Sequence, residues 1–191
     1  MTKLIIVESP FKCRKIEEVM GFEYKCMATC GHFKEAFLKP EIHDITDISE
    51  LPVKYKNNRT HKPYIDKIKM AIKSSTVVYL AFDDDREGER MCADVCWMFK
   101  LNLETTPRIV FNSITESDIR RAFDAPRTIN MNIVRSQQCR QIIDLFVGFY
   151  ISPLLQNKFK KTFNKDQIYS AGRCQTPALR IIYDNQTQIN M

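Results

Sequence analysis

Residues 76–89, Thr-Val-Val-Tyr-Leu-Ala-Phe-Asp-Asp-Asp-Arg-Glu-Gly-Glu, decide the fold. The first half, residues 76–82, is a continuous apolar run, which is typical of a strand buried on both faces of a parallel sheet. The second half is acidic, and beyond it Met91, Val95 and Phe99 recur at helical spacing. The segment therefore predicts a buried strand, an acidic loop and a helix that packs back onto the sheet.

The same succession occurs twice more along the chain. Residues 3–7, Lys-Leu-Ile-Ile-Val, precede Ser9 and Pro10, which are a favourable N-cap and a favourable first helical residue. Residues 108–111 form a third apolar run, and Thr115 begins a capping-box-like pattern in front of another helix. This alternation of strands and helices predicts an α/β fold with a parallel sheet covered by helices on both faces.

The character of the chain changes after residue 127. The elements predicted there are helices from about 128 to about 147, from Pro153 and from Thr176, with a basic loop over residues 158–165. We therefore expect an α/β domain over residues 1–127 and a mainly α-helical segment over residues 128–191.

Composition indicates a globular protein without a membrane span. Of the 191 residues, 44% are hydrophobic and 27% are charged, and no apolar run approaches the length that crosses a bilayer. The N-terminus lacks the apolar stretch of a signal peptide, so we expect an intracellular location. The net charge of +6 suits a polyanionic partner but does not identify one.

The seven cysteines are an odd number and follow no secreted disulfide pattern. Reduced thiols in an intracellular protein are the simpler interpretation. Two pairs, Cys26 with Cys30 and Cys92 with Cys96, have C-x3-C spacing. Zinc ligation is the alternative for these pairs, but buried small apolar residues are favoured.

Acidic residues follow two of the predicted strands. Glu8 comes directly after residues 3–7, and Asp83 and Asp85 come after residues 76–82. Sites form at the carboxyl ends of parallel strands, so these carboxylates converge if the two strands are neighbours. Their mutual repulsion then requires either a hard cation such as Mg²⁺ or a proton shared between two acids.

A second interpretation of the acidic run is a solvated loop and helix start, because acids are favourable near any helix N-terminus. Two acidic positions behind two buried strands favour the metal site over this alternative. Lys12, four residues after Glu8, could pair with Glu8, hold a phosphate oxygen, or be a surface lysine without a role.

The residues resemble type IA DNA topoisomerases along nearly the whole chain. The matching motifs are Leu4-Ile-Ile-Val-Glu8-Ser-Pro-Phe-Lys12, Gly31-His32, Asp83-Asp-Asp85-Arg-Glu87-Gly-Glu89, Gln137-Gln138-x-Arg140 and Ser170-Ala-Gly-Arg173-Cys-Gln175. Primases and some nucleases share a bare Asp-x-Asp, but the Arg-Glu-Gly-Glu extension and the Ser-Ala-Gly-Arg block are more specific. The resemblance implies a TOPRIM domain with a Rossmann-like sheet, then the start of a helical DNA-binding domain.

The family likeness also implies a reaction and its residues. The reaction is Mg²⁺-dependent, ATP-independent breakage, passage and rejoining of single DNA strands, with Glu8 and Lys12 beside the scissile phosphate. The implied metal ligands are Glu8, Asp83, Asp85 and Glu87. The implied DNA-binding residues are His32, Arg140, Asp144, Ser170, Ala171, Gly172, Arg173, Cys174 and Gln175.

Family members cleave DNA with a tyrosine in a Thr-Tyr-x-Arg-Thr-like motif. None of the seven tyrosines here has that context. We therefore expect a C-terminal part of the enzyme to supply the nucleophile, and this chain alone to be inactive in cleavage. The alternatives are a TOPRIM metal-dependent nuclease or primase-like enzyme, or a non-catalytic DNA-binding fragment. The Ser-Ala-Gly-Arg block favours the topoisomerase.

Overall fold

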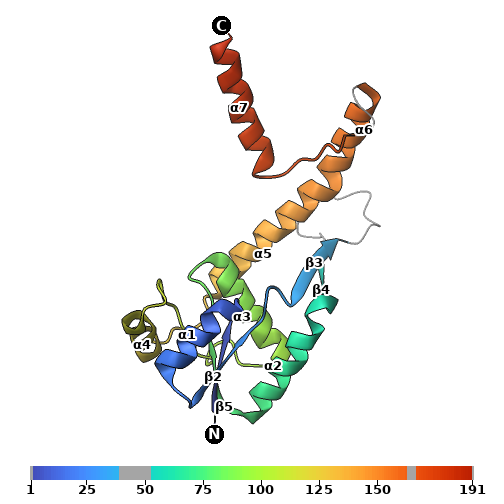
Figure 1. Cartoon of the computed structure of the whole chain (residues 1–191). Coiled ribbons are helices and arrows are strands. Elements are labelled where there is room, and N and C mark those ends of the chain that lie inside the picture. The colour runs from blue at the N-terminus through green and yellow to red at the C-terminus, as the bar shows by residue number, and fades with distance from the viewer. Residues whose placement is uncertain (1, 39–52, 163–166, 191) are drawn as a thin grey trace. The chain divides into compact units, whose positions relative to one another are not determined.

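The computed structural model describes residues 2–38, 53–162 and 167–190 (Figure 1). The strands are β1 (Thr2–Val7), β2 (Tyr24–Ala28), β3 (Lys34–Leu38), β4 (Val53–Asn57) and β5 (Ser75–Leu80). The α-helices are α1 (Pro10–Met20), α2 (Lys62–Ser74), α3 (Arg86–Phe99), α4 (Glu116–Asp124), α5 (Met131–Phe146), α6 (Ser152–Thr162) and α7 (Gln175–Ile189). A 3-10 turn, η2 (Arg59–His61), precedes α2, and a π-helical turn, η3 (Val147–Ile151), precedes α6.

The central sheet is parallel, with strand order β2-β1-β5. Ile6 of β1 pairs with Met27 of β2 on one side and with Leu80 of β5 on the other. The two strands that the sequence places in front of acidic residues are therefore neighbours. Strands β3 and β4 form a separate two-stranded sheet.

Helices cover both faces of the central sheet, which confirms the predicted α/β class. Successive side chains of β1 alternate between the two faces. On the side of α1 and α4, the buried cluster contains Ile5, Val7, Ile16, Val19, Cys26, Ile109 and Ile119. On the side of α2 and α3, it contains Leu4, Ile6, Ile68, Leu80, Met91, Cys92 and Val95.

The prediction of a regular third strand over residues 108–111 is wrong. This segment lies beside β5, but Arg108 makes only an isolated parallel bridge to Leu80 and an antiparallel bridge to Arg127. The backbone N–H of Ile109 donates to the carbonyl of Leu80 at 2.8 Å. On its other edge, Arg108 exchanges backbone hydrogen bonds with Arg127, at 2.9 and 2.8 Å.

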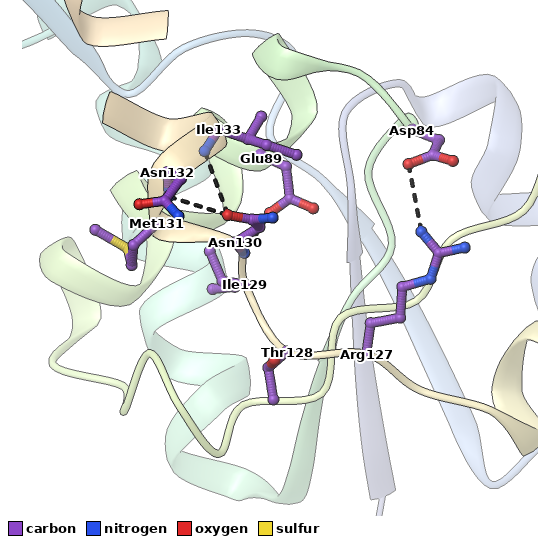
Figure 2. Close-up of a pocket in the computed structure, with 9 residues that line it drawn as sticks. All are labelled: Asp84, Glu89, Arg127, Thr128, Ile129, Asn130, Met131, Asn132 and Ile133. Carbon is purple, nitrogen blue, oxygen red and sulfur yellow. Dashed lines mark hydrogen bonds and ion pairs between the residues drawn. The ribbon is translucent and has the colours of Figure 1, made fainter. Parts of the chain in front are cut away.

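The predicted helices after residue 127 are present with corrected ends. Helix α5 begins at Met131, because the side chain of Asn130 caps it by accepting from the N–H of Asn132 at 3.0 Å (Figure 2). The predicted basic loop is wrong over residues 158–162, where α6 continues, since lysine is a good helix former. Residues 163–165 lie outside the described part.

The chain divides into two compact units. One contains Met1–Glu35 and Tyr55–Gln138, and the other contains Ala36–Lys54 and Cys139–Met191. The acidic residues lie in the first unit, whereas Arg140, Asp144 and residues 170–175 lie in the second. Within the described ranges, no helix has both the length and the apolar character to cross a bilayer.

Candidate metal and DNA site

The ends of β1 and β5 lie side by side where Glu8 and Asp83 follow them. The N–H of Ala81 donates to the carbonyl of Ile6 at 2.8 Å, which continues the pairing beyond the last residue of β5. The carbonyl of Glu8 accepts from the N–H of Cys30 at 2.9 Å. The predicted meeting of the two acid-bearing strand ends is therefore present in the backbone.

Lys12 links the first helix to the acidic loop. Its ammonium group forms an ion pair with the Asp83 carboxylate, and the Lys12 side chain is mostly buried, with 18% of its surface exposed. The sequence suggested Glu8 or a phosphate oxygen as the partner of Lys12. The observed partner, Asp83, was not among these suggestions. A cation therefore already lies beside Asp83, where it offsets part of the negative charge of the loop.

Asp85 and Glu87 have separate partners. Asp85 is the N-cap of α3, and its carboxylate accepts from the N–H of Gly88 at 2.7 Å. The alternative interpretation of the acidic run, in which acids stabilise the start of a helix, therefore holds for Asp85. The Glu87 carboxylate contacts Nε2 of His32 and accepts a hydrogen bond from the side-chain amide of Gln137. His32, predicted only as a DNA contact, lies next to an acid.

The four predicted ligands are not gathered into one group. Within residues 2–38, 53–162 and 167–190, no three acidic, histidine or cysteine side chains form a cluster able to hold a metal ion. In the same ranges the Glu8 carboxylate has no hydrogen-bond or ion-pair partner. The donor chemistry nevertheless fits Mg²⁺, since all four ligands are carboxylates and Mg²⁺ prefers oxygen. Their role as ligands stays a prediction.

Arg108 is a site-supporting residue that the sequence argument missed, because it was counted within an apolar strand. Its side chain is fully buried, and its guanidinium donates to the carbonyls of Phe82 at 2.7 Å and Asp83 at 2.6 Å. Its Nε lies 3.4 Å from a carboxylate oxygen of Glu89. Arg108 therefore fixes the backbone from which the Asp83 side chain projects. The sequence signal that could have identified Arg108 was its charge at the first position of an otherwise apolar run.

Two polar clefts border the acidic loop. The first, of about 380 Å³, is lined by Lys12, Asp83, Asp84, Phe111, Asn112, Ser113 and Ile114. The second, of about 670 Å³, is lined by Asp84, Glu89 and residues 127–133. Figure 2 shows Asp84 and Arg127 facing each other at its border. Their closest nitrogen–oxygen separation is 3.7 Å. Only the first cleft has the Lys12–Asp83 pair in its wall, so it is the better candidate for a phosphate.

In the second unit, Asp144 is shared by two arginines. Arg173 donates to both of its oxygens, at 2.7 and 3.3 Å, and Arg140 lies 3.9 Å away on the same helix. The hydrogen bond from Arg173 lowers the pKa of Asp144 below its usual value. The i,i+4 pair of Arg140 with Asp144 is thus the longer of the two contacts.

Residues 170–175 form a turn held at the start of α7. The hydroxyl of Ser152 accepts from the N–H of Ala171 at 3.0 Å, and the N–H of Gly172 donates to the hydroxyl of Thr176 at 3.1 Å. The side-chain amide of Gln175 donates to the hydroxyl of Ser170 at 3.0 Å. The turn presents Arg173 at a helix N-terminus, a location that suits an anion. DNA contact by this segment stays a prediction.

Comparison with known proteins gives matches to both segments of the chain. A family model described as a Toprim domain matches residues 3–114, and one described as a DNA topoisomerase matches residues 128–191. Among solved structures, full-length topoisomerase I from Thermotoga maritima, in a monoclinic crystal form, has a TM-score of 0.81 and 31% sequence identity. The alignment covers 97% of this chain but 30% of that protein.

The two matched segments divide the predicted site residues between them. Toprim domains bind metal ions, and the Toprim match includes all four predicted metal ligands. The topoisomerase match includes Arg140, Asp144 and residues 170–175. The chain therefore belongs to the Toprim family, and it corresponds to the N-terminal part of a type IA DNA topoisomerase.

Proposed function

We propose that this chain is the metal- and phosphate-binding part of an enzyme that breaks, passes and rejoins single DNA strands without ATP, and that it acts where DNA is found. The observation that carries the proposal is the adjacency of β1 and β5, which brings Glu8, Lys12 and Asp83 to one edge of the sheet. Sites of parallel α/β folds occupy this edge. The +6 net charge is compatible with a nucleic-acid partner.

Glu8, Asp83, Asp85 and Glu87 would hold Mg²⁺, which would stabilise the charge that develops on a phosphate during strand breakage and rejoining. The protein's own groups have distinct parts in this arrangement. Lys12 carries an ammonium group at the edge of the 380 Å³ cleft, where it can donate to a phosphate oxygen. Arg108 holds the backbone of the acidic loop in place.

A metal-dependent nuclease or primase-like enzyme is the second candidate. The same carboxylates would serve it, because a TOPRIM acid set alone does not distinguish these reactions. The topoisomerase match over residues 128–191 favours the first candidate. A nicking assay of this chain with Mg²⁺ separates the two candidates. A nuclease would nick DNA without any further domain, whereas a topoisomerase would need the tyrosine of another domain.

Substitution of both Asp83 and Asp85 by alanine is expected to abolish Mg²⁺ binding, because it removes two of four carboxylate ligands. Binding can be measured by isothermal titration calorimetry with MgCl₂. The double variant Asp66→Ala/Asp124→Ala is the matched control, since it removes the same charge from exposed positions on α2 and α4. Unchanged Mg²⁺ affinity in the first variant would remove the metal assignment.

Substitution of Arg173 by glutamine is expected to weaken the binding of single-stranded DNA and to lower its salt dependence. Loss of one phosphate contact reduces the slope of log K against log salt by about 0.7 for single strands. Fluorescence anisotropy of a labelled oligonucleotide measures both quantities. Arg180→Gln is the control, because Arg180 is also exposed and paired with one aspartate on α7. An equal loss of DNA affinity in the two variants would mean that Arg173 acts only through its general positive charge and not through a specific phosphate contact.

A further inference from the structure

Two cysteines lie on two elements that pack against each other, α1 and β2. Cys13 lies on α1, one turn before Glu17, and Cys26 lies in the middle of β2. The carboxylate of Glu17 accepts from the N–H of Cys26 at 2.7 Å, which holds this side of α1 against the strand. Cys26 belongs to the apolar cluster on the α1 side of the sheet, and the partly buried Cys13 packs against the same cluster.

The two thiols differ in accessibility and acidity. Cys13 is partly exposed, whereas Cys26 is buried. The hydrogen bond from Cys26 lowers the pKa of Cys13, although burial and the Glu17 carboxylate act in the opposite direction. The same hydrogen bond, together with burial, raises the pKa of Cys26. Cys13 is therefore the more accessible and the more acidic of the two thiols.

We propose that Cys13 and Cys26 form a reversible intramolecular disulfide on reaction with a peroxide. The Cys13 thiolate attacks one oxygen of hydrogen peroxide, the O–O bond breaks, and Cys13 becomes a sulfenic acid as hydroxide leaves. The sulfur of Cys26 then attacks the sulfenic sulfur, the S–O bond breaks, and the departing hydroxide takes up the Cys26 proton to become water. The hydroxide released in the first step is neutralised by the proton that Cys13 lost when it ionised. The dithiol loses two electrons, and one peroxide is reduced to two waters.

The bond would join α1 to β2 next to Lys12. The two sulfurs must come within about 2.05 Å of each other for this bond to form. The other buried cysteines are poor competitors, because burial raises the pKa of Cys92 and raises that of Cys96 to about 11. Cys30, which is partly exposed, is the competitor that the experiment must distinguish.

The experiment uses the full chain with Cys139→Ser and Cys174→Ser, since both of these residues are exposed and could link two molecules. One equivalent of hydrogen peroxide is expected to remove two titratable thiols and to yield a molecule about 2 Da lighter. Tandem mass spectrometry of the tryptic digest should find Cys13 linked to Cys26, and dithiothreitol should reverse the link. A disulfide to Cys30, or a Cys13 that stays reduced, would overturn the proposal.

Two variants in the same background test the order of the steps. Cys26→Ser is expected to leave a Cys13 sulfenic acid that dimedone labels, because no thiol then resolves it. Cys92→Ser is the matched control and should leave the cross-link unchanged, since Cys92 lies in the cluster on the other face of the sheet. A Cys26→Ser protein without a dimedone adduct at Cys13 would contradict the assignment of Cys13 as the attacking thiol.

Discussion

Replacing Gly88 by alanine is expected to lower the free energy of unfolding by about 3 kcal/mol and to weaken Mg²⁺ binding. A Cβ atom at Gly88 would lie 2.2 Å from the carbonyl oxygen of Asp83, and 3.0 Å from its nitrogen. No rotamer change relieves this contact, because the opposing atoms belong to the backbone. The loop that carries Asp83 and Asp85 must therefore shift. Urea denaturation and titration calorimetry measure the two effects.

Gly148→Ala is the matched control for this substitution. Gly148 lies in the π-helical turn, is exposed, and has nothing within 4 Å of an added Cβ. The free energy of unfolding of the Gly148→Ala variant should change by less than about 1 kcal/mol, since the substitution alters only the backbone freedom of the unfolded chain. Similar stabilities for the two variants would mean that the close approach of Gly88 to Asp83 is absent in solution.

Replacing Arg108 by methionine is expected to lower the free energy of unfolding by about 3–5 kcal/mol. Methionine has a similar length but no donor, so the carbonyls of Phe82, Asp83 and Ile109 lose their partner. Glu89, whose side chain is 8% exposed, would retain a buried charge without its arginine. Chemical denaturation of both proteins measures the loss.

Two further variants separate the buried charge from the rest of the effect. Adding Glu89→Gln to Arg108→Met should recover part of the lost stability, because it removes the unpaired charge and keeps an oxygen for the N–H of Asn130. Arg121→Met should cost less than about 1 kcal/mol, since that side chain is 79% exposed. A loss at Arg108 no larger than at Arg121 would contradict the supporting role.

The local elements were predictable because each depends on neighbouring residues. Helix α1 begins at Pro10 and ends before Gly21, whose φ of 84° suits glycine. Ser9 is its N-cap, as expected, yet its side chain makes no capping hydrogen bond, so Pro10 at the first turn is the stronger signal. Thr115 does cap α4, where it accepts from the N–H of Asp118.

The partners of the site residues were less predictable. The sequence suggested Glu8 or a phosphate for Lys12, but Lys12 pairs with Asp83, 71 residues away. Gln137 belongs to a family motif but had no predicted role, and its side-chain amide donates to the Glu87 carboxylate, 50 residues away in the sequence. Arg108 was missed because burial of a guanidinium depends on carbonyls and a carboxylate that only the folded chain brings around it.

By itself, the sequence determined most of the strands and helices and which acids follow the strands, because hydrophobic periodicity and helix caps act over a few residues. The tertiary structure alone decided that β1 lies between β2 and β5, and which cation or amide each carboxylate contacts. Those choices depend on packing between segments far apart in the chain, which no local pattern records.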